Sequence, residues 1–230
     1  YFEQAVSHMR ARPKLEGTVH VNLALALKFL PQYLTAAIGQ GEQYAPVPAR
    51  NEAADDDYLF AQGSASGLSK IPFHDPRPAF ARFATLPNVA TFIEQMHALG
   101  DLVATNPPSK EQSADLDFLL DIGQLFTQVV YAQLVCESAA LAIDGEPGGK
   151  RESSVSDCSD LTSAHIDRIF AVFVKDFSQY ALSLSSQPAA TEAQRDKALA
   201  LIKHPVVDAE SEATFVAEVL SYDGAYSMAP

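Results

Sequence analysis

The sequence is poor in cysteine and in basic residues, and each shortage excludes a class of protein. Only two cysteines occur among 230 residues, Cys136 and Cys158, so a disulfide framework or a zinc–thiolate site is not expected. The cytoplasm, where thiols stay reduced, is the predicted compartment. Acidic residues outnumber basic ones by 29 to 16, and the resulting net charge of −13 opposes binding to nucleic acid or to anionic lipid.

Long apolar runs and strand-like patterns are scarce as well. The longest apolar run, residues 19–30, is interrupted by His20, Asn22 and Lys28, and it is shorter than the roughly 20 residues that a membrane-spanning helix needs. We therefore predict no membrane span. The six histidines are scattered at spacings that match no metal-ligand pair, so no metal site is predicted. Period-two alternation of apolar and polar residues is almost absent.

Apolar residues recur instead at helical spacing through most of the chain. The pattern predicts an all-α fold, an antiparallel bundle of helices. The predicted helices cover residues 1–12, 18–34, 77–84, 89–105, 109–143, 162–185, 191–203 and 209–221. Asp75, Asn88 and either Thr162 or Ser163 are the predicted caps of the later helices, and Pro31 is expected to end or kink the second one. Cys136 is expected in a buried helix face and Cys158 in an exposed loop.

The segment from Arg12 to Asn22 is the most informative stretch for function. Pro13 ends the first helix, and Thr18 can accept a hydrogen bond from the first amides of the next one. Glu16 thus lies at a helix start, beside Gly17, where a missing side chain lets a ligand or another backbone come close. Ordinary helix punctuation also explains this pattern, so spacing alone does not identify a catalytic carboxylate.

The residues Glu16-Gly17-Thr18, after a basic segment and before an apolar helix, resemble the C-terminal Glu-Gly-Thr motif of acyl-CoA dehydrogenases. The resemblance implies that Glu16 is the base that removes the α proton of an acyl-CoA thioester, while FAD takes a hydride from the β carbon. It further implies that Gly17 contacts the substrate and that Thr18 and His20 contact FAD. The family usually has Gln or Glu at the position of His20 and Gln at that of Asn22.

The resemblance also implies how the chain is organised. Residues 1–38 would end the catalytic helical domain, residues 39–76 would form an irregular connection, and residues 77–230 would be a helical C-terminal extension. Tyr1 opens inside a helical pattern, so we expect a fragment that works with the N-terminal remainder of the same enzyme. An electron-transfer acceptor and a homo-oligomeric state are expected from the family. The alternative is a non-catalytic helical interaction domain in which Glu16-Gly17-Thr18 is only a helix cap.

Overall fold

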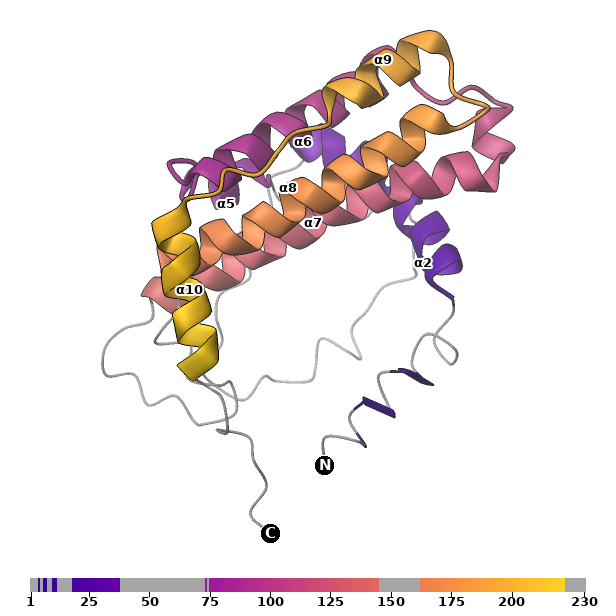
Figure 1. Ribbon diagram of the computed structural model, residues 1–230. Coiled ribbons are helices and arrows are strands. Elements are labelled where there is room, and N and C mark those ends of the chain that lie inside the picture. Colours follow the sequence, from indigo (N-terminus) through magenta and orange to yellow (C-terminus); the bar gives the residue numbers. More distant parts are fainter. Residues whose placement is uncertain are drawn as a thin grey trace.

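The computed structural model describes residues 18–37, Phe73, residues 75–144 and 162–221, and single residues at positions 4, 6, 7, 10 and 11. Every regular element in these parts is a helix and none is a strand, which confirms the all-α prediction for the described residues (Figure 1). The α-helices are α2 (Val19–Ala26), α3 (Leu30–Ala37), α5 (Arg77–Ala81), α6 (Pro87–Thr105), α7 (Leu116–Asp144), α8 (Ser163–Ser186), α9 (Glu192–Ala200) and α10 (Ala209–Ser221). Two short 3₁₀ helices are η1 (Leu27–Phe29) and η3 (Gln112–Ala114).

The helical segment from α2 to α3 continues past Pro31, which was expected to end or kink it. Pro31 lies in the first turn of α3, where its missing amide costs little, and the chain stays helical to Ala37. The α-helical hydrogen bonds are nevertheless interrupted at η1, just before Pro31. Proline has no amide to donate to the carbonyl of Leu27, so the distortion has a local cause.

The centre of the molecule is the packing of α7 against α8, which lie along each other (Figure 1). Most buried residues of α7 recur at alternating steps of four and three, and most of those of α8 follow nearly the same spacing, so each helix presents one continuous apolar stripe to the other. These residues are Phe118, Ile122, Leu125, Val129, Ala132, Cys136 and Ala139 of α7, and Ile166, Phe170, Phe173, Phe177, Ala181 and Leu184 of α8.

Helix α6 completes this core through a cluster of aromatic rings. The ring of Phe92 is fully buried, and its centroid lies 5.5 Å from those of Phe170 and Phe177 and 5.7 Å from that of Phe173. Edge-to-face contacts of this kind add to the hydrophobic gain of burial. Leu30 and Tyr33 of α3 belong to the same buried cluster, so the segment before residue 38 packs against the helices that follow residue 77. The domain boundaries themselves stay a prediction.

Asn88 is not a helix cap, contrary to our expectation. Helix α6 begins at Pro87, and Asn88 lies inside its first turn with 2% of its surface exposed. Its side-chain Nδ2 donates to the carbonyl of Val206 at 3.0 Å, and its Oδ1 accepts from the amide of Val206 at 2.7 Å. Its backbone and side-chain N–H groups also donate to the carboxylate of Asp167. The side chain therefore fixes a distant segment instead of its own helix end.

Ser178 of α8 holds the same non-helical segment, residues 202–208, at its residue Lys203. Its hydroxyl donates to the carbonyl of Lys203 at 2.8 Å and accepts from the amide of Lys203 at 2.9 Å. Gln95, which is fully buried, donates to the carbonyl of Leu201 at 2.9 Å. These polar groups satisfy backbone atoms that neither helix nor sheet pairs, so the segment lies fixed between α6 and α8. The helix predicted over 191–203 accordingly ends at Ala200.

Two other helix starts are set by polar side chains. Helix α7 begins at Leu116, later than the predicted position 109, because Ser109 and Gln112 bond each other's backbone amides in a turn before η3. The carboxylate of Asp115 then accepts hydrogen bonds from the amide of Phe118, at 3.3 Å, and from the amide of Asp117. At the start of α8, Thr162 is the cap, and His165 completes a capping box with it.

Helix α10 lies against the start of α8, whereas α2 packs near the start of α7; the two lie toward opposite ends of the molecule (Figure 1). Glu218 of α10 lies 2.9 Å from the ring of His165, and Glu212 pairs with Arg168. The Arg168 guanidinium also lies 4.9 Å from the centre of the Phe215 ring. None of the residues of α10 is fully buried, so these contacts carry its attachment.

Candidate functional site

The predicted catalytic stretch ends at a helix start whose geometry the structure describes from Thr18 onward. The hydroxyl of Thr18 accepts a hydrogen bond from the amide of Val21 at 3.4 Å, so Thr18 caps α2 as expected. Glu16 and Gly17, the predicted base and substrate contact, lie outside the described residues. Their roles therefore stay predictions, and the structure bears on them only through the helix that follows.

The two predicted cofactor contacts, Thr18 and His20, are both exposed. No hydrogen bond or ion pair joins the ring of His20 to any other residue in the described parts. Asn22, one turn from Thr18, is exposed as well. These polar groups are therefore free to meet a molecule that approaches the start of α2, but the assignment to FAD stays a prediction.

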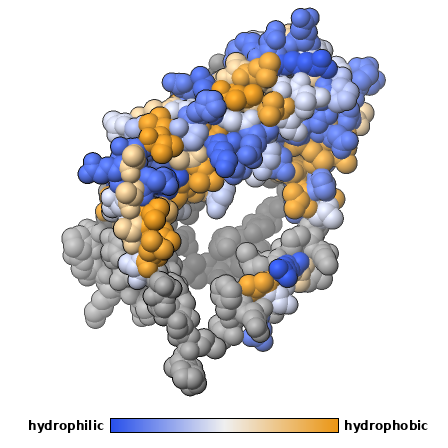
Figure 2. Space-filling view, in the orientation of Figure 1, coloured by the Kyte–Doolittle hydropathy of each residue, from blue (hydrophilic) through white to orange (hydrophobic). Residues whose placement is uncertain are grey.

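Helix α2 is apolar on two faces, and only one of them is covered. Leu23 is buried against α7, where a Cβ built on Gly123 would lie 3.5 Å from the carbonyl oxygen of Leu23. On the opposite side Val21 and Leu25 are exposed by 61% and 45%, and Val19, one turn before Leu23, is exposed by 53%. Figure 2 shows this apolar surface over α2, together with a second one over α10. An uncovered apolar face on a helix that carries a candidate site favours contact with another polypeptide.

A series of three hydrogen-bonded side chains connects α3 with α7. The hydroxyl of Tyr33 donates to Oε1 of Gln133 at 2.8 Å, and Nε2 of Gln133 donates to Oε1 of Glu137 at 2.7 Å. Burial, together with the negative charge of Glu137, raises the pKa of Tyr33 well above its usual value. Glu137 is half-buried and is the last member of this series of hydrogen bonds.

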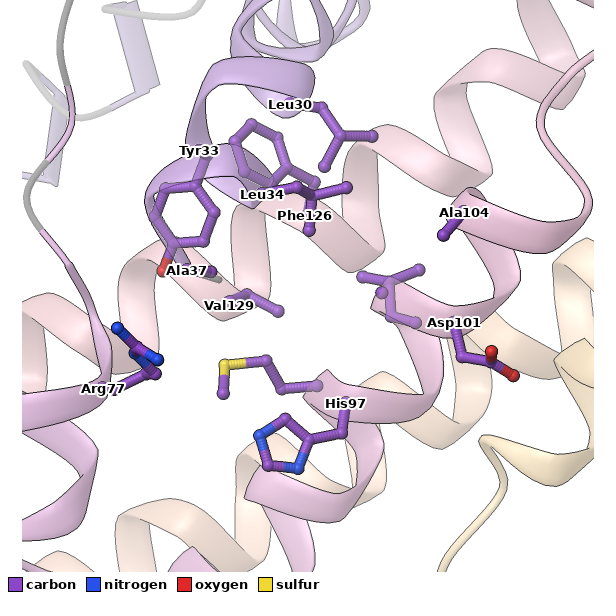
Figure 3. Close-up of a pocket in the computed structure, with 13 residues that line it drawn as sticks. Leu30, Tyr33, Leu34, Ala37, Arg77, His97, Asp101, Ala104, Phe126 and Val129 are labelled. Carbon is purple, nitrogen blue, oxygen red and sulfur yellow. The ribbon is translucent and has the colours of Figure 1, made fainter. Parts of the chain in front are cut away.

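A pocket of about 390 Å³ opens beside Tyr33, between α3, α6 and α7 (Figure 3). Its walls are mainly hydrocarbon, from Leu30 and Leu34 of α3, Met96 and Leu99 of α6, and Phe126 and Val129 of α7. Polar groups lie only toward its edge, where Figure 3 shows Arg77, His97 and Asp101. Its size and its mixture of apolar walls with a few polar groups are typical of small-molecule sites.

The charges at the edge of this pocket are paired. The guanidinium of Arg77 donates to both carboxylate oxygens of Asp75, from Nη2 to Oδ2 at 2.6 Å and from Nε to Oδ1 at 2.9 Å. The hydrogen bond from Arg77 lowers the pKa of the Asp75 carboxyl, and the same bond raises the pKa of Arg77. Asp101 pairs with Lys197 of α9. The edge therefore carries hydrogen-bonding groups without a strong net charge.

Neither Tyr33 nor this pocket was identified from the sequence. The polar residue Gln133 within an apolar helix face was the one available signal, because a buried amide needs a partner. The three walls of the pocket come from parts of the chain that are far apart in sequence. Helical spacing predicts that Leu30, Met96 and Val129 are core residues, but it does not show that a space remains between them.

Two general features limit the kinds of site that the described residues can form. No group of three or more His, Cys, Asp or Glu side chains that could hold a metal ion occurs in these parts of the chain. The segment Leu116–Ile143 of α7 is long and apolar enough to cross a membrane, although the core helix of a soluble protein meets the same criterion. The prediction of no membrane span therefore stays a prediction.

Comparison with protein-family models, with curated proteins and with solved structures found no match to this chain. The functional assignment accordingly depends on its own residues and on their geometry.

Proposed function

We propose that this chain is the C-terminal part of an FAD-dependent acyl-CoA dehydrogenase, with Glu16 as the base that abstracts the α proton of an acyl-CoA thioester. The observation that carries the proposal is the Glu16-Gly17-Thr18 motif directly before an apolar helix, with Thr18 as the cap of that helix. A general base must be held within reach of the proton that it removes, and the cap at Thr18 fixes the start of the helix that follows Glu16.

Abstraction of the α proton makes two demands on the residues around Glu16. An α proton of a thioester is weakly acidic, so the base must lie within hydrogen-bond reach of it and the enolate must meet fixed donors. Burial beside an apolar acyl chain would raise the pKa of Glu16 toward the working pH. Gly17 leaves room for the thioester to approach the backbone. The proposal requires no further acid or base from this chain.

The residues at the start of α2 fit a flavin, since Thr18 and His20 offer exposed hydrogen-bonding groups with no competing ion pair in the described parts. FAD, when bound, supplies the acceptor for the hydride that leaves the β carbon. Thr18 and His20 would hold it, and the exposed Val19, Val21 and Leu25 would pack against the N-terminal remainder of the enzyme. An electron-transfer acceptor, a homo-oligomeric and cytoplasmic enzyme, and an antiparallel order of the helices are parts of the same proposal.

The variant Glu16→Gln, in the complete enzyme, tests the proposal. The change keeps the size of the side chain but removes the base, so FAD and acyl-CoA binding should persist while flavin reduction slows by several orders of magnitude. Stopped-flow bleaching of the flavin absorbance measures this step. Glu111→Gln is a matched control, because Glu111 is exposed and lies in a turn remote in sequence from the motif. Bleaching of Glu16→Gln at the wild-type rate would reject the assignment.

The second candidate function is a non-catalytic helical interaction domain. One observation favours it: a row of exposed apolar residues runs along α7 and continues on α8, apart from the start of α2. The row consists of Tyr131, Leu134 and Leu141 of α7 and Ile169 and Val172 of α8. A colourless, stable preparation without flavin absorbance would favour this candidate, whereas a yellow preparation or a co-purifying second polypeptide favours the dehydrogenase.

A further inference from the structure

The lining of the pocket between α3, α6 and α7 follows two of these helices for about two turns each. Its α6 wall extends from Met96 to Ala104, eight residues or about 12 Å along the helix, and its α3 wall extends from Leu30 to Ala37. Phe126 and Val129 of α7 close it from a third side. A space that follows two helices for two turns is better matched by a linear chain than by a compact ring system.

Gly100 shows that this space reaches the backbone of α6. A Cβ built on Gly100 would meet no atom within 4 Å, although Gly100 lies in the middle of a helix that packs against the core. Interiors are normally close-packed, and helix positions normally carry side chains because glycine costs helix stability. An empty position at the pocket wall is therefore consistent with an occupant that is not part of the described chain.

The edge of the pocket selects against a charged head group. Arg77 is bound by Asp75, and Asp101 is bound by Lys197, so the two charged side chains at the edge are already paired. The ring of His97 makes no ion pair among the described residues, and it offers one further hydrogen-bonding group. A carboxylate or phosphate would also meet the field of a chain with net charge −13. A hydroxyl meets neither penalty.

From these observations we infer that the pocket binds a linear aliphatic chain that ends in an uncharged hydroxyl group. The alkyl part lies along α3 and α6 against Leu34, Met96 and Val129, and the hydroxyl lies at the edge within reach of His97. This site uses none of the residues of the Glu16 motif and does not depend on the dehydrogenase proposal. Its walls are helices of the described core, so its test needs only a folded preparation of this chain, alone or together with an upstream polypeptide.

The methyl group of Met96 gives a direct readout of occupancy. The chain holds only three methionines, so a sample labelled with ¹³C at the methionine methyl groups gives three signals, and the variant Met96→Leu identifies that of Met96. Titration with 1-octanol should shift the Met96 signal in a saturable way and leave the other two unchanged. Titration with octanoate at neutral pH should give at least about tenfold weaker binding, because Arg77 at the edge is already bound by Asp75 and the net charge of the chain is negative.

Variants that fill the space separate pocket binding from non-specific partitioning. Gly100→Leu and Ala104→Leu add a side chain at the pocket wall and should each weaken 1-octanol binding at least tenfold. Gly100→Ala adds one carbon and should change binding less than about twofold. Ala193→Leu, at an exposed position of α9, is the matched control and should bind as the wild type does.

Three results would overturn the inference. The first is the lack of a saturable Met96 shift with 1-octanol in the wild-type chain. The second is unchanged binding in both filled variants, or an equal loss in Ala193→Leu. The third is tighter binding of octanoate than of 1-octanol, which would show that the edge of the pocket recognises an anion.

Discussion

The thiol of Cys136 illustrates how burial alone decides the chemistry of a side chain. Cys136 has no exposed surface and faces α8 in the stripe of α7. Burial is the main cause that raises the pKa of its thiol to about 12, and the negative charge of Glu137 acts in the same direction. The residue is thus the small buried hydrophobe that the helical pattern predicts, while Cys158 lies outside the described residues.

We expect Cys136 to resist modification in the folded protein. At pH 8 a thiol reagent should modify Cys158 first and Cys136 at least about tenfold more slowly, because the thiolate is the reactive form. In urea both should react at similar rates, as mass spectrometry can show. Equal labelling of both cysteines in the native protein would contradict this expectation.

The raised pKa of Cys136 also predicts that the stability of the protein falls as pH rises from the ordinary thiol value of 9.0 toward 12, because only the unfolded state loses its thiol proton there.

At the scale of elements, Asn88 joins three parts of the chain. It bonds Asp167 of α8 and both backbone groups of Val206, from inside α6. Replacing it with alanine would remove the side-chain partner of Asp167 Oδ2 and of both backbone groups of Val206, while the backbone amide at position 88 would still donate to Asp167 Oδ1. We expect Asn88→Ala to lower the free energy of unfolding by about 1–3 kcal/mol.

The loss should be concentrated in the segment that Asn88 holds. Hydrogen exchange should accelerate at the amides of Lys203 and Val206 in Asn88→Ala, and urea unfolding measures the overall cost. Asn22→Ala is the control, because Asn22 is exposed on α2 and alanine favours helix there. Unchanged protection of Val206 in Asn88→Ala would show that the segment is held by other contacts.

The crossing of α2 over α7 depends on the small size of Gly123. A Cβ at this position would lie 3.4 Å from Cδ1 of Leu27 and 3.5 Å from the carbonyl oxygen of Leu23. Gly123→Ala should therefore fit and stabilise α7 by up to about 1 kcal/mol. Gly123→Leu should instead force α2 away from α7 and destabilise the protein by about 1–3 kcal/mol.

Gly100→Ala is the matched control for this crossing, because it gains the same helix propensity without contacting α2. Urea unfolding of the three variants gives the comparison, and proteolysis at α2 reports whether that helix has moved. If Gly123→Leu is as stable as Gly123→Ala, α2 does not pack on α7 as closely as the structure indicates.

Helix identity was predictable from local pattern, whereas several helix ends were not. The all-α class, the cap at Thr18 and the ends of α6, α7 and α8 follow from apolar spacing and from proline, threonine and loop composition. Asn88 was misassigned because its partners lie 79 and 118 residues away, and a local rule cannot include them. The predicted start of α7 was wrong because the side chains of Ser109 and Gln112 bond each other's backbone amides before the helix begins.

The candidate sites differ in the same way. Thr18 and His20 lie two residues apart in the sequence, so a sequence motif suffices to propose them together with Glu16 and Gly17. The pocket needs α3, α6 and α7 to meet, and the empty position at Gly100 becomes visible only when all three are in place. Sequence periodicity predicts which residues are apolar and inward, but packing decides whether they fill the space between the helices.

At the scale of the whole molecule, the exposed apolar face of α2 leads to the last prediction. Val21 and Leu25 lie on one side of α2, shortly after the motif, and are 61% and 45% exposed. If the chain is part of a dehydrogenase, this face should pack against the upstream polypeptide that completes the flavin site. Expressed alone, residues 1–230 should then aggregate, self-associate or bind no FAD.

Complementation in trans measures this dependence. The upstream polypeptide, supplied with residues 1–230, should restore flavin incorporation and acyl-CoA-dependent reduction of an artificial electron acceptor. Val21→Asp should weaken this association, because it places a charge in the centre of the apolar face, whereas Lys28→Asp, at another exposed position of the same segment, serves as the control for added negative charge. A well-behaved monomer that gains neither flavin nor stability from the upstream polypeptide would favour the non-catalytic helical domain, since the apolar face of α2 would then have no partner of that kind.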